Sequence, residues 1–214
     1  MKRLIAAAAA LALVLVLSAP AKAGQLPPGG TGVPTVFTTS LGTLLANTGE
    51  LSWSGSTMRG LAETEVFRDP NNVFCPDCLD FAFAIFNNGK SADMIARITD
   101  RDFAGFLTDV GYTTWESCSR GTDIDPTEVD RSPNGTSIGF DWSTPNLVGP
   151  GECTPVLDIE TNATSFSMGT LNVIDGSVAS VRTYAPMVPE PSSLILLGSG
   201  LFGLAEYLRR RKSE

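Results

Sequence analysis

The stretch LDFAFAIFNNG, residues 79–89, alternates large apolar residues with small or polar ones and then ends in a turn signal. Because successive side chains of a β-strand point to opposite faces, this pattern predicts a strand with one apolar face. That face would carry Leu79, Phe81, Phe83 and Ile85. Asn-Asn-Gly at 87–89 is typical of a hairpin turn. We therefore expect residues 94–98 to form the next strand and to pair back onto 79–86.

The same period of two recurs toward the C-terminus. Ile138, Phe140 and Trp142 would share one face of a strand that follows a turn at 134–135. In 157–160, Leu157 and Ile159 would face inward, and Asp158 and Glu160 outward. Residues 171–174 and 178–184 would form a hairpin around Asp175-Gly176. Residues 101–109 fit a helical turn or a strand, and 119–135 resemble a polar loop. No long amphipathic helix appears between the two ends of the chain, so the sequence predicts an all-β protein, an antiparallel β-sandwich of jelly-roll or Greek-key type.

Composition excludes several functions. The chain of 214 residues has no histidine, which removes histidine general bases, Ser-His-Asp and Cys-His nucleophiles and histidine metal sites. Residues 24–188 carry 8 basic and 20 acidic side chains, a net charge of 8 − 20 = −12. Such a surface repels nucleic acid and attracts divalent cations. We expect the protein to have no enzymatic activity. The remaining catalytic alternative is a glycoside hydrolase that uses a pair of carboxylates.

All four cysteines, Cys75, Cys78, Cys118 and Cys153, lie in the central part of the chain. An even number in an exported protein predicts two disulfides, and of the three possible connectivities we favour 75–78 with 118–153. The CPDC spacing also fits a thioredoxin-like redox pair, although a strand pattern follows it rather than a helix. Zinc bound by the four thiolates is a further alternative.

The C-terminus combines three features in order. Pro189-Glu190-Pro191 is stiff and extended, because proline fixes φ and restricts the residue before it. An apolar run from Leu194 follows, short for a transmembrane helix. The last feature is a cationic cluster that would stay on the cytoplasmic side, formed by Arg209, Arg210, Arg211 and Lys212.

The N-terminus has the pattern of a secretory signal peptide. Lys2 and Arg3 precede the apolar stretch 4–17, and Ala21 and Ala23 place small residues before a cleavage at Gly24. We therefore expect a signal peptide at 1–23, a flexible linker at 24–33, a β-sandwich ectodomain at 34–186 and a sorting signal with a transmembrane helix at 187–214.

This C-terminal arrangement resembles the PEP-CTERM sorting signal of exopolysaccharide-producing Gram-negative bacteria, which an exosortase processes. Residues 108–112, 137–140, 161–164 and 169–176 also resemble a recurring type of PEP-CTERM ectodomain. The resemblance implies an all-β envelope protein without an assigned activity. It also implies an exosortase-like partner, transient attachment to the inner membrane, and a final place at the cell surface or in the extracellular matrix.

Two further sites are candidates. Asp123, Asp125, Glu128 and Asp130 place four carboxylates within eight residues, which suits Ca²⁺. A solvated acidic loop is the simpler explanation, because the stretch lacks the glycine that an EF-hand loop requires. Trp53 lies among serines and glycine, a setting that favours an exposed ring able to stack on a sugar. Trp142 is expected in the core, and Trp115 against a disulfide.

We therefore expect a non-enzymatic structural or adhesive β-sandwich, associated with exopolysaccharide and sorted by an exosortase-like enzyme. The alternative is a carbohydrate-binding module that uses Trp53 and calcium, with no other cofactor.

Overall fold

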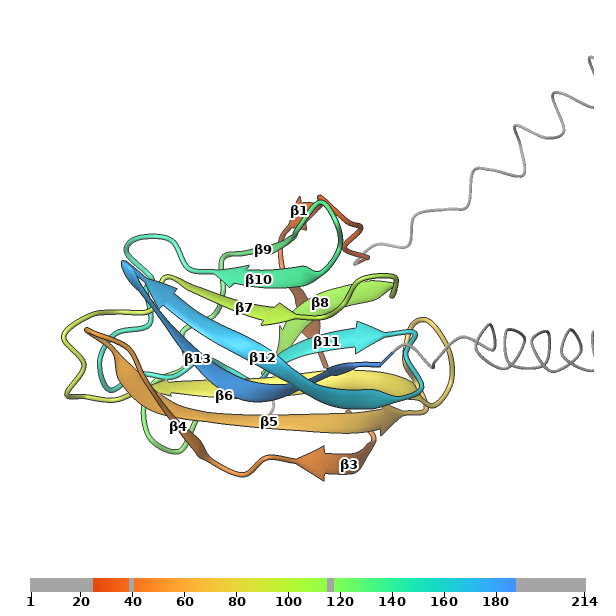
Figure 1. Cartoon of the computed structure of the whole chain (residues 1–214), viewed down its shortest axis with the longest axis horizontal. Coiled ribbons are helices and arrows are strands. Elements are labelled where there is room, and N and C mark those ends of the chain that lie inside the picture. Colours follow the sequence, from red (N-terminus) through yellow and green to blue (C-terminus); the bar gives the residue numbers. More distant parts are fainter. Residues whose placement is uncertain (1–24, 39–40, 115–117, 188–214) are drawn as a thin grey trace, which may run out of the picture.

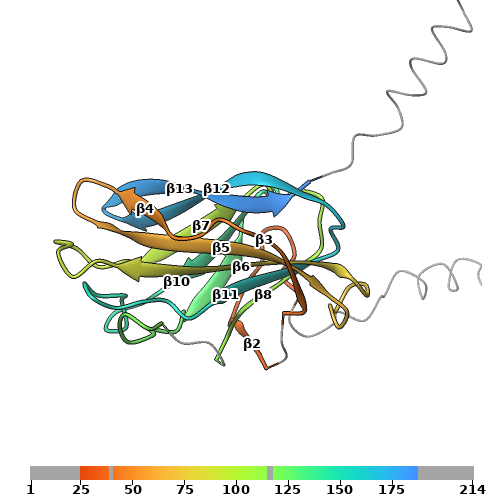
Figure 2. The same cartoon turned by 90° about the horizontal axis from the view of Figure 1, so that it is seen from below.

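The computed structural model describes residues 25–38, 41–114 and 118–187. Within these ranges the chain forms thirteen strands and no helix, so the all-β prediction is confirmed. The strands build two sheets that face each other (Figures 1 and 2). The predicted signal peptide and transmembrane helix lie outside the described residues.

The first sheet has six strands, all in antiparallel pairs. In spatial order they are β1 (Thr31–Gly32), β9 (Glu128–Arg131), β10 (Ser137–Asp141), β7 (Arg97–Arg101), β12 (Phe166–Asp175) and β13 (Ser177–Pro186). The hairpins β9–β10 and β12–β13 confirm two predicted turns. Gly135 and Gly176 have φ of 71° and 60°, the left-handed region that glycine enters without steric cost.

The second sheet contains residues 79–86, the alternating stretch from which the first strand was predicted. Its spatial order is β2 (Thr35–Phe37), β8 (Thr108–Thr113), β11 (Leu157–Thr161), β6 (Cys78–Asn87), β5 (Arg59–Asp69) and β3 (Thr43–Asn47), and β4 (Leu51–Ser54) also pairs with β5. The pair β2–β8 is parallel, so this sheet is mixed rather than purely antiparallel as predicted.

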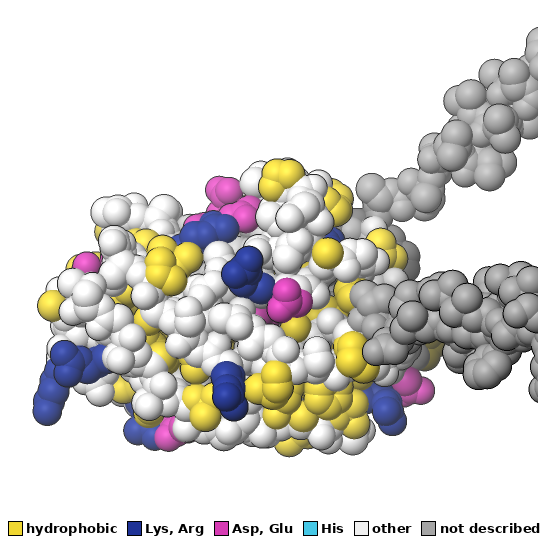
Figure 3. Space-filling model, in the orientation of Figure 1, with side chains coloured by type: hydrophobic (Ala, Val, Ile, Leu, Met, Phe, Trp, Pro, Cys, Tyr) yellow, Lys and Arg dark blue, Asp and Glu magenta, His cyan; other side chains and the backbone are white. Residues whose placement is uncertain are grey.

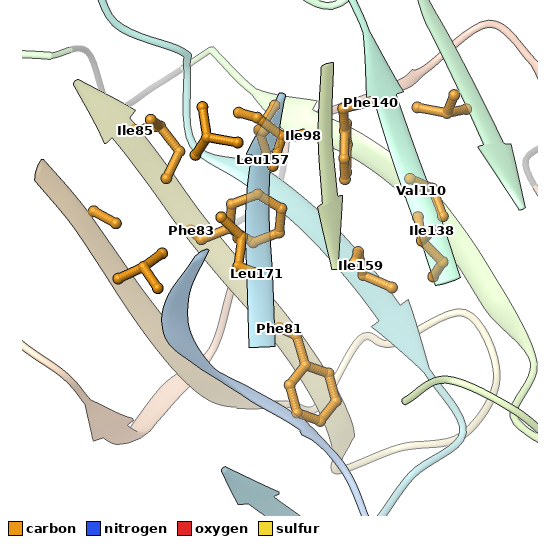
Figure 4. Packing of buried hydrophobic residues seen from close by; sticks show 14 of the residues in the cluster. Phe81, Phe83, Ile85, Ile98, Val110, Ile138, Phe140, Leu157, Ile159 and Leu171 are labelled. Carbon is orange, nitrogen blue, oxygen red and sulfur yellow. The ribbon is translucent and has the colours of Figure 1, made fainter. Parts of the chain in front are cut away.

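The core lies between the two sheets (Figure 4). Phe81, Phe83 and Ile85 of β6 point into it, as the alternation predicted, and each is at most 2% exposed. The Phe83 ring meets Phe140 of the opposite sheet edge-to-face, with centroids 5.6 Å apart. Full burial of each such side chain contributes about 1.5–3 kcal/mol, so these contacts are a main source of stability.

The predicted hairpin after Gly89 is wrong. β6 pairs with β5 on one side and β11 on the other, which leaves no free edge for a following strand. The Asn87 side chain is buried and donates hydrogen bonds to the carbonyls of Asp93 and Val148. The chain therefore crosses to the six-stranded sheet, where β7 begins at Arg97 rather than at 94.

Three other expectations need correction. Residues 102–107 connect β7 to β8 without forming a helix or a strand, and the expected loop at 119–135 contains β9. The expected flexible linker is part of the sandwich over residues 25–33. Leu26 is 5% exposed, and its carbonyl accepts a hydrogen bond of 3.1 Å from the buried Arg131 guanidinium.

Asp158 and Glu160 were expected to face solvent, which is also wrong. They are 0% and 8% exposed, although they lie on the face of β11 away from the core. Part of this burial comes from β2. Gly111 of β8 has no side chain, and the Thr35 carbonyl and the Phe37 ring of β2 occupy the space where a Cβ would lie. The 70–77 loop covers another part, through a hydrogen bond from the Val73 amide to Glu160.

Candidate functional site

The chain leaves the sandwich at a fixed point. The Met187 amide donates to the Ser165 carbonyl over 3.0 Å, and the Ser165 hydroxyl donates to the Met187 carbonyl over 2.9 Å. The start and the end of the described chain lie toward the same end of the sandwich (Figure 1). Residues 188–214 of the predicted sorting signal, which include Pro189, Glu190 and Pro191, and the predicted signal cleavage at Ala21, Ala23 and Gly24 lie outside the described part.

Both predicted disulfides are present, Cys75–Cys78 and Cys118–Cys153. Cys78 begins strand β6, so no helix N-terminus is available to lower a thiol pKa there, and the redox alternative loses its structural basis. With all four sulfurs in disulfides, the zinc alternative has no thiolate ligands. Cys118–Cys153 fixes the 118–123 loop beside Phe86, which forms an isolated β-bridge with Cys153.

A groove of about 390 Å³ lies beside this second disulfide. Its apolar lining includes Leu61, Ala84, Phe86 and Val156. Polar groups stand at the same groove: Arg120 binds Glu50, with Nη2 2.6 Å from Oε1, and Asn47 donates to the lining residue Glu63 over 2.8 Å. The Arg120 guanidinium lies 6.0 Å from the centroid of the Phe86 ring.

The groove is distant from the point where the chain leaves the sandwich. Asp80, near the start of β6, pairs with Glu160, which is next to the end of β11 and the Ser165 region. Phe86 is six residues farther along the same strand, about 20 Å at 3.3 Å per residue. Met187, where the described chain ends, and the groove at Phe86 therefore lie at opposite ends of the sandwich.

The four carboxylates of the predicted calcium loop do not converge in the structure. Asp123 accepts the Cys118 amide, and Asp125 accepts the Tyr112 hydroxyl over 3.3 Å. Asp130 binds Arg97, whose hydrogen bonds hold the pKa of that carboxyl below its usual range. Glu128 is exposed on β9.

Trp53 is not an exposed sugar platform, since it is only 3% exposed. β4 pairs with β5 and turns this side chain toward the core, where its ring lies over Gly60, a residue without a Cβ to obstruct it. Trp142 is buried, as predicted, and donates its indole N–H to the Ile124 carbonyl over 2.8 Å. Trp115 lies outside the described residues.

A group of buried carboxylates was not anticipated from the sequence. Burial raises the pKa of Asp80 to about 8 and that of Glu160 to about 6. Burial, together with repulsion from Asp80, raises the pKa of Asp158 well above its ordinary value, and burial also raises the pKa of Asp109. Four acids with raised pKa values lie on the outer face of the seven-stranded sheet, on adjacent strands β6, β11 and β8.

Among the described residues, three metal-ligating side chains, Cys118, Asp123 and Cys153, lie within 4.8 Å of one another. Two of them form a disulfide, so they offer no thiolate to a metal. On the face drawn in Figure 3, cationic side chains are scattered among polar and acidic ones. The groove beside the Cys118–Cys153 disulfide is the candidate ligand site considered below.

Comparison with known families identifies the C-terminus. Residues 188–212 match the PEP-CTERM protein-sorting motif. The chain therefore carries this motif, and exosortase-dependent sorting of an exported, membrane-passing precursor follows from it. No curated protein and no solved structure matches the chain. Within the described residues, no helix combines the length and apolar character needed to cross a membrane.

Proposed function

We propose that this PEP-CTERM domain-containing protein is a non-enzymatic adhesive unit, which an exosortase-like enzyme delivers to the cell surface or matrix and which binds extracellular polysaccharide. The observation that carries the proposal is the amphipathic groove, which lies at the end of the sandwich opposite Met187, the last described residue before the sorting signal. A protein attached to the surface through its C-terminus presents that end outward.

The groove has the chemistry of a saccharide site. The face of a pyranose ring is apolar, and it packs on a flat aromatic surface such as the partly exposed Phe86. The hydroxyls at its edge need polar partners, and Arg120, Glu50 and Glu63 supply them at this groove. An apolar groove with a few placed polar groups is the usual form of a small-ligand site.

The same groups argue against hydrolysis. A glycosidase needs two carboxyl groups facing each other across the bond that breaks, one of them able to donate a proton. At the groove, Glu50 is bound by Arg120, and Glu63 accepts a hydrogen bond from Asn47. Asp80 and Asp158, whose pKa values are high, are 0% exposed and out of reach of a polymer.

The test is retardation of the protein in native gels that contain the polysaccharide of the producing cells. We expect the wild-type protein to be retarded, and Arg120→Ala to bind about tenfold more weakly, the effect of losing one charge-assisted hydrogen bond. Phe86→Ala should weaken binding similarly. Arg182→Ala removes an exposed cation from β13 in the other sheet and is the matched control.

Incubation of the protein with the same polymer tests the absence of catalysis. No new reducing ends should form over the time in which binding reaches equilibrium. Release of oligosaccharides that is lost in Glu50→Gln or Glu63→Gln would contradict the proposal and support the hydrolase alternative.

A further inference from the structure

The outer face of the β12–β13 hairpin is exposed and almost uncharged. Because alternate residues of a strand share a face, the buried Leu171 and Val173 fix the outward positions of β12, and the buried Ala179 and Val181 fix those of β13. The outward side chains are Phe166, Met168, Thr170, Asn172, Ile174, Val178, Ser180, Arg182 and Tyr184. None of them is a carboxylate, although residues 24–188 carry 20 acidic and 8 basic side chains.

Apolar side chains gather at the end of this face where the described chain stops. Met168 is 52% exposed and lies opposite Tyr184 in the strand register. The Tyr184 ring meets Phe166 edge-to-face, with centroids 5.5 Å apart. Met187, which is 43% exposed, follows Pro186, the residue opposite Phe166. We name these side chains the hairpin patch (Phe166, Met168, Tyr184 and Met187), and Figure 3 shows hydrophobic side chains near the end of the described chain.

The adjoining end of the sandwich adds a further exposed apolar side chain. Leu107 is 52% exposed, and its amide donates to the Asn162 side chain over 2.8 Å. Asn162 is three residues before Ser165, which exchanges two hydrogen bonds with Met187. The stretch 162–168 contains no charged residue. The chain therefore leaves the sandwich among apolar and neutral polar groups.

The sequence beyond Met187 determines what the hairpin patch can meet. Residues 188–212 match the sorting motif, which implies a membrane-passing precursor. Six residues, 188–193, separate Met187 from the apolar run that begins at Leu194. A chain of six residues spans at most about 20 Å when fully extended, so an inserted run holds this end of the sandwich close to the bilayer. The start of the described chain lies toward the same end (Figure 1).

We propose that the hairpin patch rests on the lipid headgroup region of the inner membrane while the precursor is held there by its tail. Aromatic rings that carry a polar group suit this region, because its environment changes from polar to apolar over a short depth. The contact brings no carboxylate of the hairpin face toward lipid phosphates, since the single charged side chain at the outward positions is the cation Arg182. The tail raises the effective concentration of the patch at the bilayer, so a small apolar area is sufficient.

This orientation leaves the groove proposed for polysaccharide free. Phe86 lies on the outward face of β6 in the seven-stranded sheet, whereas the hairpin patch lies on the outward face of the six-stranded sheet. With the patch on the bilayer, the groove is directed away from it. Membrane contact depends on the patch and the tail alone, so it can fail while polysaccharide binding holds, and the reverse is also possible.

The test places one full-length chain in a nanodisc of phosphatidylethanolamine and phosphatidylglycerol, with an environment-sensitive dye on a single introduced cysteine. The native cysteines are all in disulfides and do not react with the dye. Dyes at Met168→Cys and at Val178→Cys are compared, because both residues are exposed and apolar but lie toward opposite ends of the hairpin. We expect a blue shift and quenching by nitroxide-labelled lipid at 168, and neither at 178.

Charge variants with the dye at Thr170→Cys provide the matched comparison. Met168→Glu should abolish lipid quenching at 170, because a carboxylate resists transfer out of water. Val178→Glu should leave the quenching unchanged. Both substitutions replace exposed side chains, so both proteins should fold as the wild type does.

Three results would overturn the proposal: equal lipid quenching at 168 and 178, no quenching at 168, or quenching at 170 that survives Met168→Glu. A blue shift at 168 without quenching by labelled lipid would assign the patch to a protein surface, and would overturn the proposal as well.

Discussion

Asn72 donates a hydrogen bond of 2.7 Å from its side-chain amide to Oδ1 of Asp80, and both residues are buried. The same amide reaches the Thr161 carbonyl at 3.1 Å, and Oδ1 of Asn72 accepts the Phe74 amide at 2.9 Å. One side chain therefore closes the 70–77 loop on itself and attaches it to two strands. It is also the one side-chain donor to Asp80 among the described residues.

Replacing Asn72 with Ala should destabilise the protein by about 2–3 kcal/mol. The substitution leaves Asp80 without its donor, and the penalty for an unsatisfied buried group exceeds the net value of an ordinary hydrogen bond. Urea denaturation measures the change in the free energy of unfolding. Asn71→Ala is the control, because Asn71 is exposed and uses only its backbone amide, toward Asp69. Equal effects of the two substitutions would contradict the role assigned to Asn72.

The buried acids Asp80, Asp158 and Glu160 should make stability fall as pH rises, opposite to ordinary acid denaturation. Burial raises the pKa of Asp80 to about 8 and that of Glu160 to about 6, and raises that of Asp158 further. Between the ordinary carboxyl pKa of about 4 and pH 8, the folded chain holds protons that the unfolded chain releases. The stability slope with pH is therefore negative in this window.

We expect the full-length protein to lose on the order of 4 kcal/mol between pH 5 and pH 8, because Asp80 alone changes the free energy of unfolding by about 1.4 kcal/mol per pH unit up to its folded-state pKa of about 8. Denaturation curves at fixed ionic strength measure it. Asp158→Asn should reduce the slope. A stability that is constant or rises from pH 5 to pH 8 would show that these carboxyls ionise normally.

The disulfide Cys118–Cys153 should contribute more stability than Cys75–Cys78. The two cysteines are 35 positions apart, against 3 for the other pair. In the chain-entropy description, replacing both cysteines by serine costs roughly 4 kcal/mol for the long loop and roughly 2 kcal/mol for the short one. The long-loop variant should also lose polysaccharide binding, since the disulfide fixes the loop that carries Arg120. Loss of binding in the short-loop variant alone would contradict this assignment.

Glu190→Ala should block maturation, because a carboxylate between two prolines is the recognisable feature of the matched motif. Intact-mass measurement of protein from cells that possess the processing enzyme checks this. The wild-type protein should end before Glu214, and the variant should accumulate as precursor in the inner membrane. Glu214→Ala removes a carboxylate outside residues 188–212 and should mature normally. Unchanged maturation of Glu190→Ala would count against recognition of Pro-Glu-Pro.

Local patterns in the sequence predicted the features that depend on neighbouring residues. Alternation identified the core face of β6, and glycine at positive φ closed the hairpins at 135 and 176. Strand partners were not predictable in the same way. The turn at 87–89 resembles a hairpin, but β5 and β11 already occupy both edges of β6, and β11 is more than 70 residues away in sequence.

The candidate sites were harder to predict for a related reason. An acid on the polar face of a strand is expected to meet water. Nothing near Asp158 in the sequence reveals that Phe37 lies close to Gly111 and that the 70–77 loop reaches Glu160 on that face. Phe86 was the available signal for the groove, since it shares the outward face of β6 with Asp80, where an aromatic ring is unusual. Trp53 was favoured for its polar neighbours, but pairing of β4 with β5 determined its direction.

The most direct test of the account is the distribution of the mature protein between the extracellular polysaccharide and the culture medium. We expect wild-type protein and Arg182→Ala to stay with the polysaccharide, whereas Arg120→Ala should mature normally and appear in the medium. If Arg120→Ala and Phe86→Ala remain with the polysaccharide as fully as the wild type, the groove is not the binding site and the proposed adhesive function is contradicted.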